Sequence, residues 1–373
     1  MTSRTPLAPP AGRTTGPEED PPPGPSPRPR LPALRLPGPG LSVRWNPRAT
    51  AVGLVLAAAV LVVGVWTLTT GDFHIPVPDV LAVLTGGGAP GDEYVVNELR
   101  LPRLLTALLV GAAMGMSGAL FQTLARNPLG SPDVIGFTVG SATGALVTIL
   151  VIGAGTASVA AGSVAGCALT SVVVYLLAWR GGAAGYRLVL VGIGISALLS
   201  SANAYLIARA SFTDAQSAQV WLTGSLNGRG WEHVTTMAVC LAVLAPAALV
   251  LGRPLRMLEM GEDAAAALGV GVERTRGGAL AVGVALTALS TAVAGPVPFV
   301  SLVAPQVVRR LTRATGPNLA ASAVMGALLL ALSDIAAQRA LAPTQLPVGV
   351  FTGVVGGCYL VWVLARQWRS GRG

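Results

Sequence analysis

The run AVGLVLAAAVLVVGVWTLT, residues 51–69, contains no charged side chain. A helix that crosses a bilayer needs about 20 consecutive apolar residues, so this run is long enough to span a membrane. Charged residues make up 11% of the 373-residue chain, whereas a soluble domain has roughly 25%. Hydrophobic residues make up 52%. The sequence therefore predicts an all-α integral membrane protein.

Similar apolar runs follow one another to the end of the chain and predict about ten transmembrane helices. They cover residues 51–69, 101–123, 134–153, 157–179, 188–208, 234–252, 278–295, 299–313, 318–338 and 346–366. A short additional helix is expected near 216–226. We therefore expect a transmembrane domain over residues 49–373.

The arginines indicate how these helices are oriented. All 25 basic residues are arginine, and the chain has no lysine. If the N-terminus is cytoplasmic and each span crosses once, 20 arginines lie inside and five lie outside. Because cytoplasmic loops are enriched in basic residues, this distribution predicts that both termini are cytoplasmic. This distribution of arginines also accounts for the net charge of +9, so the charge does not imply a nucleic-acid partner.

Residues 1–48 differ from the rest, since they contain 14 of the 28 prolines and seven arginines. Such a segment cannot bury enough apolar surface to offset the entropy of ordering, so a disordered cytoplasmic tail is expected. Either the tail is inert, or a stretch such as Pro23–Pro29 docks a partner in the polyproline conformation.

The composition excludes several kinds of chemistry. Without lysine there is no P-loop lysine and no Schiff base. Two histidines and three scattered cysteines leave little for a metal site or a disulfide framework. We therefore expect no catalytic residue, no cofactor and no metal on this chain. Asp334 is the one acidic residue well inside an apolar run, where it is either a functional group or a hydrogen-bond partner of a neighbouring helix.

Two polar stretches suggest contacts with partners. In LRLPRLL, residues 99–105, Arg100 and Arg103 lie near one face at the outer end of the second span. They either extend to lipid headgroups or bind carboxylates of an external partner. The long cytoplasmic connection 255–276 contains a short helix-forming segment, Glu262 to Leu268, with Gly269 placed to end it. It is either a solvated loop or a surface helix that a motor subunit grips.

Five motifs occur in order: RLPR at 100–103, RNPLGSP at 126–132, GEDAAAALG at 261–269, AVAGPVPFVSLVAPQVVRR at 292–310 and LPVG at 346–349. Together they resemble the FecCD-type permeases, the membrane subunits of ABC importers for iron-siderophores, haem and cobalamin. The resemblance covers about residues 51–366. The run WLTGSLNG, residues 221–228, is most similar to ferric-siderophore permeases.

This resemblance implies a ten-helix type II ABC importer permease fold in the cytoplasmic membrane. It also implies a second permease subunit, identical or paralogous, and an extracytoplasmic substrate-binding protein. Two cytoplasmic ATPase subunits would bind ATP and Mg, and an iron-siderophore would be the substrate. No covalent chemistry would occur on this chain.

The resemblance further assigns roles to individual residues. Arg100, Arg103 and Arg339 look like the arginines that dock the binding protein. Asn127 and Leu129 look like a cytoplasmic gate. The ATPase-coupling residues would be Gly261, Glu262, Ala264, Ala267, Leu268 and Gly269. The chain departs from many relatives at Gln306, where they have histidine, and at Gln345, where they have glutamate.

Two alternative functions remain compatible with the sequence. A permease for haem or cobalamin would share the fold and every motif. An ion-coupled secondary transporter would work without an ATPase and would place ionisable groups near the membrane midplane. A membrane-embedded enzyme is disfavoured because it would need clustered His, Asp or Glu within the spans.

Overall fold

The computed structural model describes residues 33–35, 42–44, 47–71, 73–153, 155–178, 185–341 and 344–370. The chain forms two compact units, Met1–Asn46 and Pro47–Gly373. In the first, strand β1 (Ala33–Arg35) pairs antiparallel with β2 (Ser42–Arg44). The other residues of the expected tail, up to residue 46, lie outside the described residues.

Every regular element in the described residues of the second unit is a helix. Its elements are α1 (Pro47–Thr69), α2 (Val77–Leu84), α3 (Pro90–Tyr94), the π-helical η1 (Val95–Arg100), α4 (Leu101–Leu124), α5 (Pro132–Ile135), α6 (Phe137–Val147), the π-helical η2 (Thr148–Ile152), α7 (Thr156–Ala178), α8 (Gly185–Arg209), α9 (Phe212–Leu222), α10 (Trp231–Leu258), α11 (Glu262–Ala267), α12 (Val272–Ala294), α13 (Val300–Thr312), α14 (Leu319–Arg339) and α15 (Val348–Ser370).

The prediction of about ten transmembrane helices is confirmed. Within the described residues, seven helices are long and apolar enough to cross a membrane, and two shorter apolar ones cover Phe137–Ile152 and Val348–Val363. Helix α13 occupies the remaining expected span. The extra helix expected near 216–226 is α9, which begins and ends about four residues earlier. The sequence analysis did not anticipate α2 and α3.

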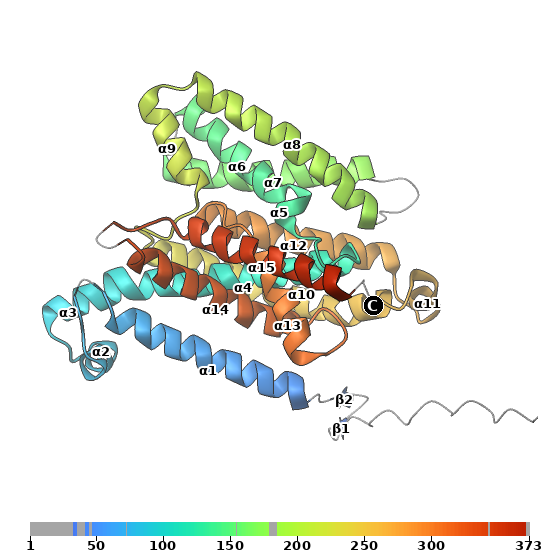
Figure 1. Cartoon of the computed structure of the whole chain (residues 1–373), viewed down its shortest axis with the longest axis horizontal. Helices are drawn as coiled ribbons and strands as arrows, with labels where there is room; N and C mark the ends of the chain where they lie inside the picture. The colour runs from blue at the N-terminus through green and yellow to red at the C-terminus, as the bar shows by residue number, and fades with distance from the viewer. Residues whose placement is uncertain are drawn as a thin grey trace, which may run out of the picture. The chain divides into compact units, whose positions relative to one another are not determined.

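Helix α4 is the centre of the unit and packs against α10, α12, α13 and α14 (Figure 1). Its closest neighbour is α14, because small residues line the contact. A methyl group on Gly111 would overlap the backbone of Gly326, and one on Gly115 would overlap the backbone of Ser322. The four-residue glycine spacing therefore serves helix packing, as such motifs do in membranes.

Helices α6, α7 and α8 form a second packed group beside α12 (Figure 1). Gly140 and Gly144 of α6 lie directly against Gly166 and Gly162 of α7. The span expected at 134–153 is not one continuous helix. Gly136, with φ of 93°, ends α5 and redirects the chain into α6.

The outer faces of the helices carry large apolar side chains. On α1, Leu54 and Leu61 are 67% and 71% exposed, and on α10 Val250 is 74% exposed. Apolar surface this extensive is unfavourable in water. It suits a hydrocarbon environment, which agrees with the low charge of the sequence.

Candidate functional site

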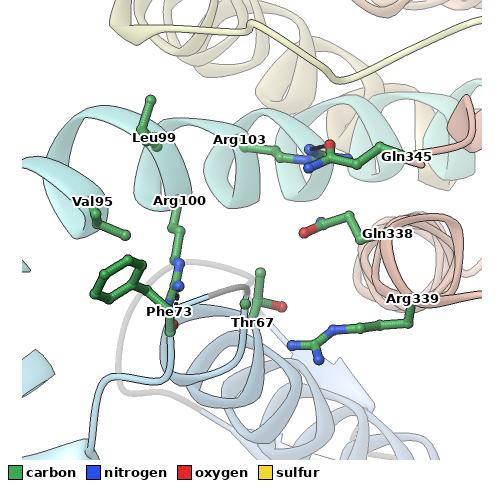
Figure 2. Close-up of a pocket in the computed structure, with 10 residues that line it drawn as sticks. Thr67, Phe73, Val95, Leu99, Arg100, Arg103, Gln338, Arg339 and Gln345 are labelled. Carbon is green, nitrogen blue, oxygen red and sulfur yellow. Dashed lines mark hydrogen bonds between the residues drawn. The ribbon is translucent and has the colours of Figure 1, made fainter. Parts of the chain in front are cut away.

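One pocket brings the three predicted docking arginines together. It has a volume of about 270 Å³ and is lined by residues of the α1–α2 connection, η1, α4, α14 and the segment before α15. Figure 2 shows Arg100 and Arg339 reaching toward it from different helices, with Arg103 beside Gln345. Arg339 is more than 230 positions away from Arg100 and Arg103 in sequence, and the packing of α4 on α14 makes them neighbours.

Arg103 is held inside the protein by a buried carboxylate. Its Nε and Nη2 atoms donate to the two oxygens of Asp334 at 2.9 and 2.8 Å, and Nη1 donates to Oε1 of Gln345 at 2.8 Å. The Asp334 side chain is 2% exposed and that of Arg103 is 13% exposed. Gln338 donates a further hydrogen bond to Asp334. Asp334 is therefore the hydrogen-bond partner of a neighbouring helix, one of the two alternatives for this residue.

Arg100 also makes contacts within the chain. Its Nη1 atom donates to the carbonyl of Leu68 at 2.6 Å, and Nη2 donates to the carbonyl of Phe73. These bonds fix the connection that follows α1, and Gly71 leaves space for the guanidinium because a side chain there would overlap it.

Arg339 differs from the other two arginines because it is exposed. Its guanidinium takes part in no ion pair or hydrogen bond with the described part of the chain. In Figure 2 it extends from α14 into the pocket beneath Gln338. Of the three, it has the charge most available to an external partner.

At the other end of α4 lies the predicted gate. Asn127 and Leu129 form a tight turn in which Asn127 Oδ1 accepts from the Leu129 amide at 2.9 Å. Gln306 of α13 donates its Nε2 to the carbonyl of Pro128 at 2.8 Å, and the Tyr359 hydroxyl of α15 donates to Gln306 Oε1 at 3.4 Å. Gln306 thus fastens this turn to α13 and, through Tyr359, to α15.

A second pocket, of about 360 Å³, opens beside this turn and has both gate residues in its wall. Arg309 and Arg310 also line it. The Arg310 guanidinium lies 4.8 Å above the ring of Trp362, a cation–π contact that orders the end of α15. The gate residues therefore border a real opening with positive charge at its edge.

The predicted coupling segment forms α11, as the sequence indicated. Gly261 (φ 118°) precedes it and Gly269 (φ 82°) follows it, so glycine supplies the left-handed backbone at both ends. Ala265 is fully buried and attaches the helix to the protein, while Ala264 and Ala267 are exposed. Leu268 is 62% exposed. The exposed part of α11 thus combines small alanines and an apolar leucine with the two acids of its first turn, Glu262 and Asp263.

Glu262 connects α11 to the gate turn. Its Oε1 atom lies 2.5 Å from Arg276 Nη2 and 3.4 Å from Arg126 Nη2. Arg126 precedes Asn127 directly and also donates to the Leu258 carbonyl at 3.1 Å. The ion pair between Glu262 and Arg126 therefore connects α11 to the residue that precedes the predicted gate turn.

Two polar residues near the gate escaped the sequence analysis. Asp133 accepts hydrogen bonds from Ser301 and Thr138, both at 2.6 Å. Gln122 donates to the Leu302 carbonyl at 3.0 Å and accepts from Arg309. Both residues tie the α4–α6 region to α13. In the sequence, each of them could be noticed only as a polar residue at the edge of an apolar run. Sequence spacing does not show which distant residue forms its hydrogen bond.

A solved structure has the same arrangement of helices. It is described as an inward-facing conformation of a metal-chelate type ABC transporter, with a TM-score of 0.77 and 27% identity, covering 85% of this chain and 99% of that one. Together with the apolar helices, this likeness defines the class of the protein as a multi-pass membrane permease of the ABC transporter type.

The family model of the FecCD transport family matches residues 58–366, and the chain belongs to this family. The ferric enterobactin transport system permease protein FepG of Escherichia coli (strain K12) is 45% identical, with 85% of this chain and 96% of that protein covered. The Fe(3+) dicitrate permease protein FecD of the same organism is 36% identical, with 85% and 99% covered. The achromobactin permease protein CbrC of Dickeya dadantii (strain 3937) is 34% identical, with 85% and 93% covered.

Proposed function

We propose that this chain is the membrane-spanning subunit of an importer that moves an iron-siderophore complex into the cytoplasm. The observation that carries the proposal is the 45% identity to the ferric enterobactin permease over nearly its whole length. Permeases named for ferric dicitrate and achromobactin follow at lower identity. These relatives favour a ferric chelate over haem or cobalamin.

Energy for transport would come from partner subunits. Two cytoplasmic ATPases would bind ATP and Mg, and the exposed α11 of each permease subunit, with Leu268 at its end, would sit in a cleft of one ATPase. ATP hydrolysis on partner subunits agrees with the lysine-free composition of this chain, because a P-loop needs a lysine to contact the phosphates. A second permease, identical or paralogous, would complete the translocation path.

Substrate would be delivered from outside by a binding protein. Its carboxylates would meet the pocket rim at Arg339, with Arg100 and Arg103 contributing positive potential from their internal positions. The pocket is too small for the binding protein to enter, so the binding protein would contact only its positively charged rim.

The transport step would couple these two ends. Closure of the ATPases would displace α11, and the Glu262–Arg126 contact would pass this displacement to Asn127 and Leu129. The gate turn would then move relative to α13 and α15. Glu262 and Arg126 are 44% and 48% exposed, so their ion pair is weak enough to rearrange during each cycle.

Reconstitution in proteoliposomes tests the proposal. The chain would be combined with its ATPase and binding-protein partners, and four labelled substrates compared: ferric enterobactin, ferric citrate, haem and cobalamin. We expect uptake of a ferric chelate that requires ATP and the binding protein and persists with a protonophore. Uptake that needs an ion gradient instead of ATP would contradict the proposal, and preference for haem or cobalamin would correct the substrate.

A further inference from the structure

A third pocket lies where the N-terminal end of α1, the C-terminal end of α10 and the start of α14 meet. Its volume is about 470 Å³, the largest of the three pockets described. None of the residues assigned above to docking, gating or coupling lines it. Two arginines, Arg253 and Arg256, belong to its wall, and no acidic residue does.

The positive charge at this pocket is only partly neutralised. Arg253 is exposed and takes part in no ion pair or hydrogen bond within the part of the chain that is described. Arg256 lies near Glu259, but that carboxylate also faces Arg309 and accepts from the Gly316 backbone. Burial raises the pKa of the Glu259 carboxyl despite these contacts. The pocket therefore has an excess of positive charge.

Helix α14 begins in the wall of the same pocket. The side chain of its N-cap, Asn318, makes no capping hydrogen bond, and the first three helical residues, Leu319, Ala320 and Ala321, line the pocket. The backbone N–H groups at this position have no partner within the helix. They add the partial positive charge of a helix N-terminus to that of the two arginines.

The rest of the wall is uncharged and mostly apolar. Gly53 of α1, Leu249 of α10 and Val324 of α14 line it without a charged group. Two of the helices that line it also carry exposed apolar side chains, since Val55 of α1 and Val250 of α10 are 67% and 74% exposed. A ligand that fits has an anionic head and a hydrocarbon tail.

We propose that this pocket binds an anionic phospholipid of the cytoplasmic leaflet, with its phosphate at Arg253 and Arg256 and an acyl chain along Gly53 and Leu249. Basic pockets between transmembrane helices at the cytoplasmic side bind such headgroups in other membrane proteins. The arginine distribution places this end of α10 in the cytoplasm.

Native mass spectrometry of the full chain in detergent tests the proposal. Phosphatidylglycerol would be titrated against phosphatidylcholine with the same acyl chains, and we expect the former to be retained selectively. Each basic residue near an anionic lipid contributes about a fivefold change in affinity. Arg253→Gln should therefore weaken binding about fivefold and the double variant with Arg256→Gln about 30-fold. Arg274→Gln, an exposed arginine outside the pocket, should leave it unchanged.

A second variant tests the acyl-chain part without altering charge. A Cβ atom at Gly53 meets nothing within 4 Å, so Gly53→Leu should fold normally, fill the groove and weaken phosphatidylglycerol binding. Gly277→Leu, equally unobstructed but outside the pocket, is its control.

Three results would overturn the proposal: equal retention of both lipids, unchanged binding in the double arginine variant, or displacement of the lipid by excess inorganic phosphate. The last would identify a site for a soluble anion. Because uptake is not measured, the outcome is independent of which substrate the permease carries.

Discussion

Single residues determine the structure of the docking pocket and of the gate turn, the two regions that the proposed transport cycle connects. Arg103 was a docking candidate in the sequence, and in the structure it forms a two-point ion pair with Asp334, 231 residues away. Arg100 was also a docking candidate in the sequence, and in the structure it fixes the connection after α1. The docking role of all three arginines stays a proposal, and Arg339 is the residue on which it can be tested cleanly.

Removing the carboxylate of the internal pair should destabilise the fold. Asp334→Ala leaves the nearly buried Arg103 without a countercharge, and breaking one side of a buried pair costs about 3–5 kcal/mol. We expect a clear fall in the thermal unfolding midpoint of the detergent-purified chain. Arg339→Ala, nearby but exposed, should leave the midpoint unchanged, and Arg103→Met with Asp334→Leu should recover most of the loss. An unchanged midpoint in Asp334→Ala would show that the pair contributes little.

Reversing the charge of Arg339 should affect docking alone. Arg339→Glu replaces an attractive contact with a repulsive one at the pocket rim, so we expect the affinity for the external binding protein to fall at least about tenfold, or 1.4 kcal/mol. The unfolding midpoint should stay the same. Arg209→Glu, another arginine predicted to lie outside, serves as the matched control. Equal affinity for Arg339→Glu and the unaltered chain would remove Arg339 from the docking surface.

Among elements, the long apolar runs and the short helices α9 and α11 were predictable from the sequence, whereas α2 and α3 were not. Runs such as 51–69 and 318–338 match α1 and α14 closely because burial in hydrocarbon requires an unbroken apolar stretch. Helices α2 and α3 have eight and five residues, below the length at which periodicity is informative. The division of α5 from α6 depends on one left-handed glycine, Gly136, which looks in sequence like the packing glycines that follow it.

Helix α11 is the element on which assembly with the ATPases should depend. Leu268→Asp places a charge on an apolar side chain that is 62% exposed, so it should disrupt a contact with a partner without disturbing the interior. We expect the ATPase subunits to stop copurifying while the unfolding midpoint is retained. Leu311→Asp, at an exposed leucine of α13, is the control and should copurify normally. Full copurification of Leu268→Asp would place the ATPase contact elsewhere.

At the scale of the whole molecule, composition was sufficient for the membrane class and the approximate number of helices, and the ordered motifs were sufficient for the family. Spacing could not show which distant residues meet. Glu262 contacts Arg126 across 136 positions, and that contact depends on how α10 and α12 pack against α4. The three pockets have the same origin, because each lies between helices that are remote in sequence.

The membrane topology is the remaining whole-molecule prediction, and α13 is its critical element. At 13 residues, α13 is about 20 Å long, shorter than the roughly 30 Å hydrocarbon core. The non-helical residues 295–299 before it can supply the remaining length, since a chain outside a helix covers up to about 3.3 Å per residue. We therefore expect α13 to complete a crossing.

Alkaline phosphatase fusions, active only outside, test this expectation. Fusions after Ala210 and Ala340 should be active, and fusions after Met260, Thr315 and Gly373 should be inactive. If α13 instead turned back without crossing, the pattern would invert from Thr315 onward. Arg309, Arg310 and Arg313 would then lie outside, against the preference of basic residues for the cytoplasm. Activity after Thr315 would thus refute the ten-span topology. If the pattern were already inverted at Ala210 or Met260, the error would lie in a helix that precedes α13.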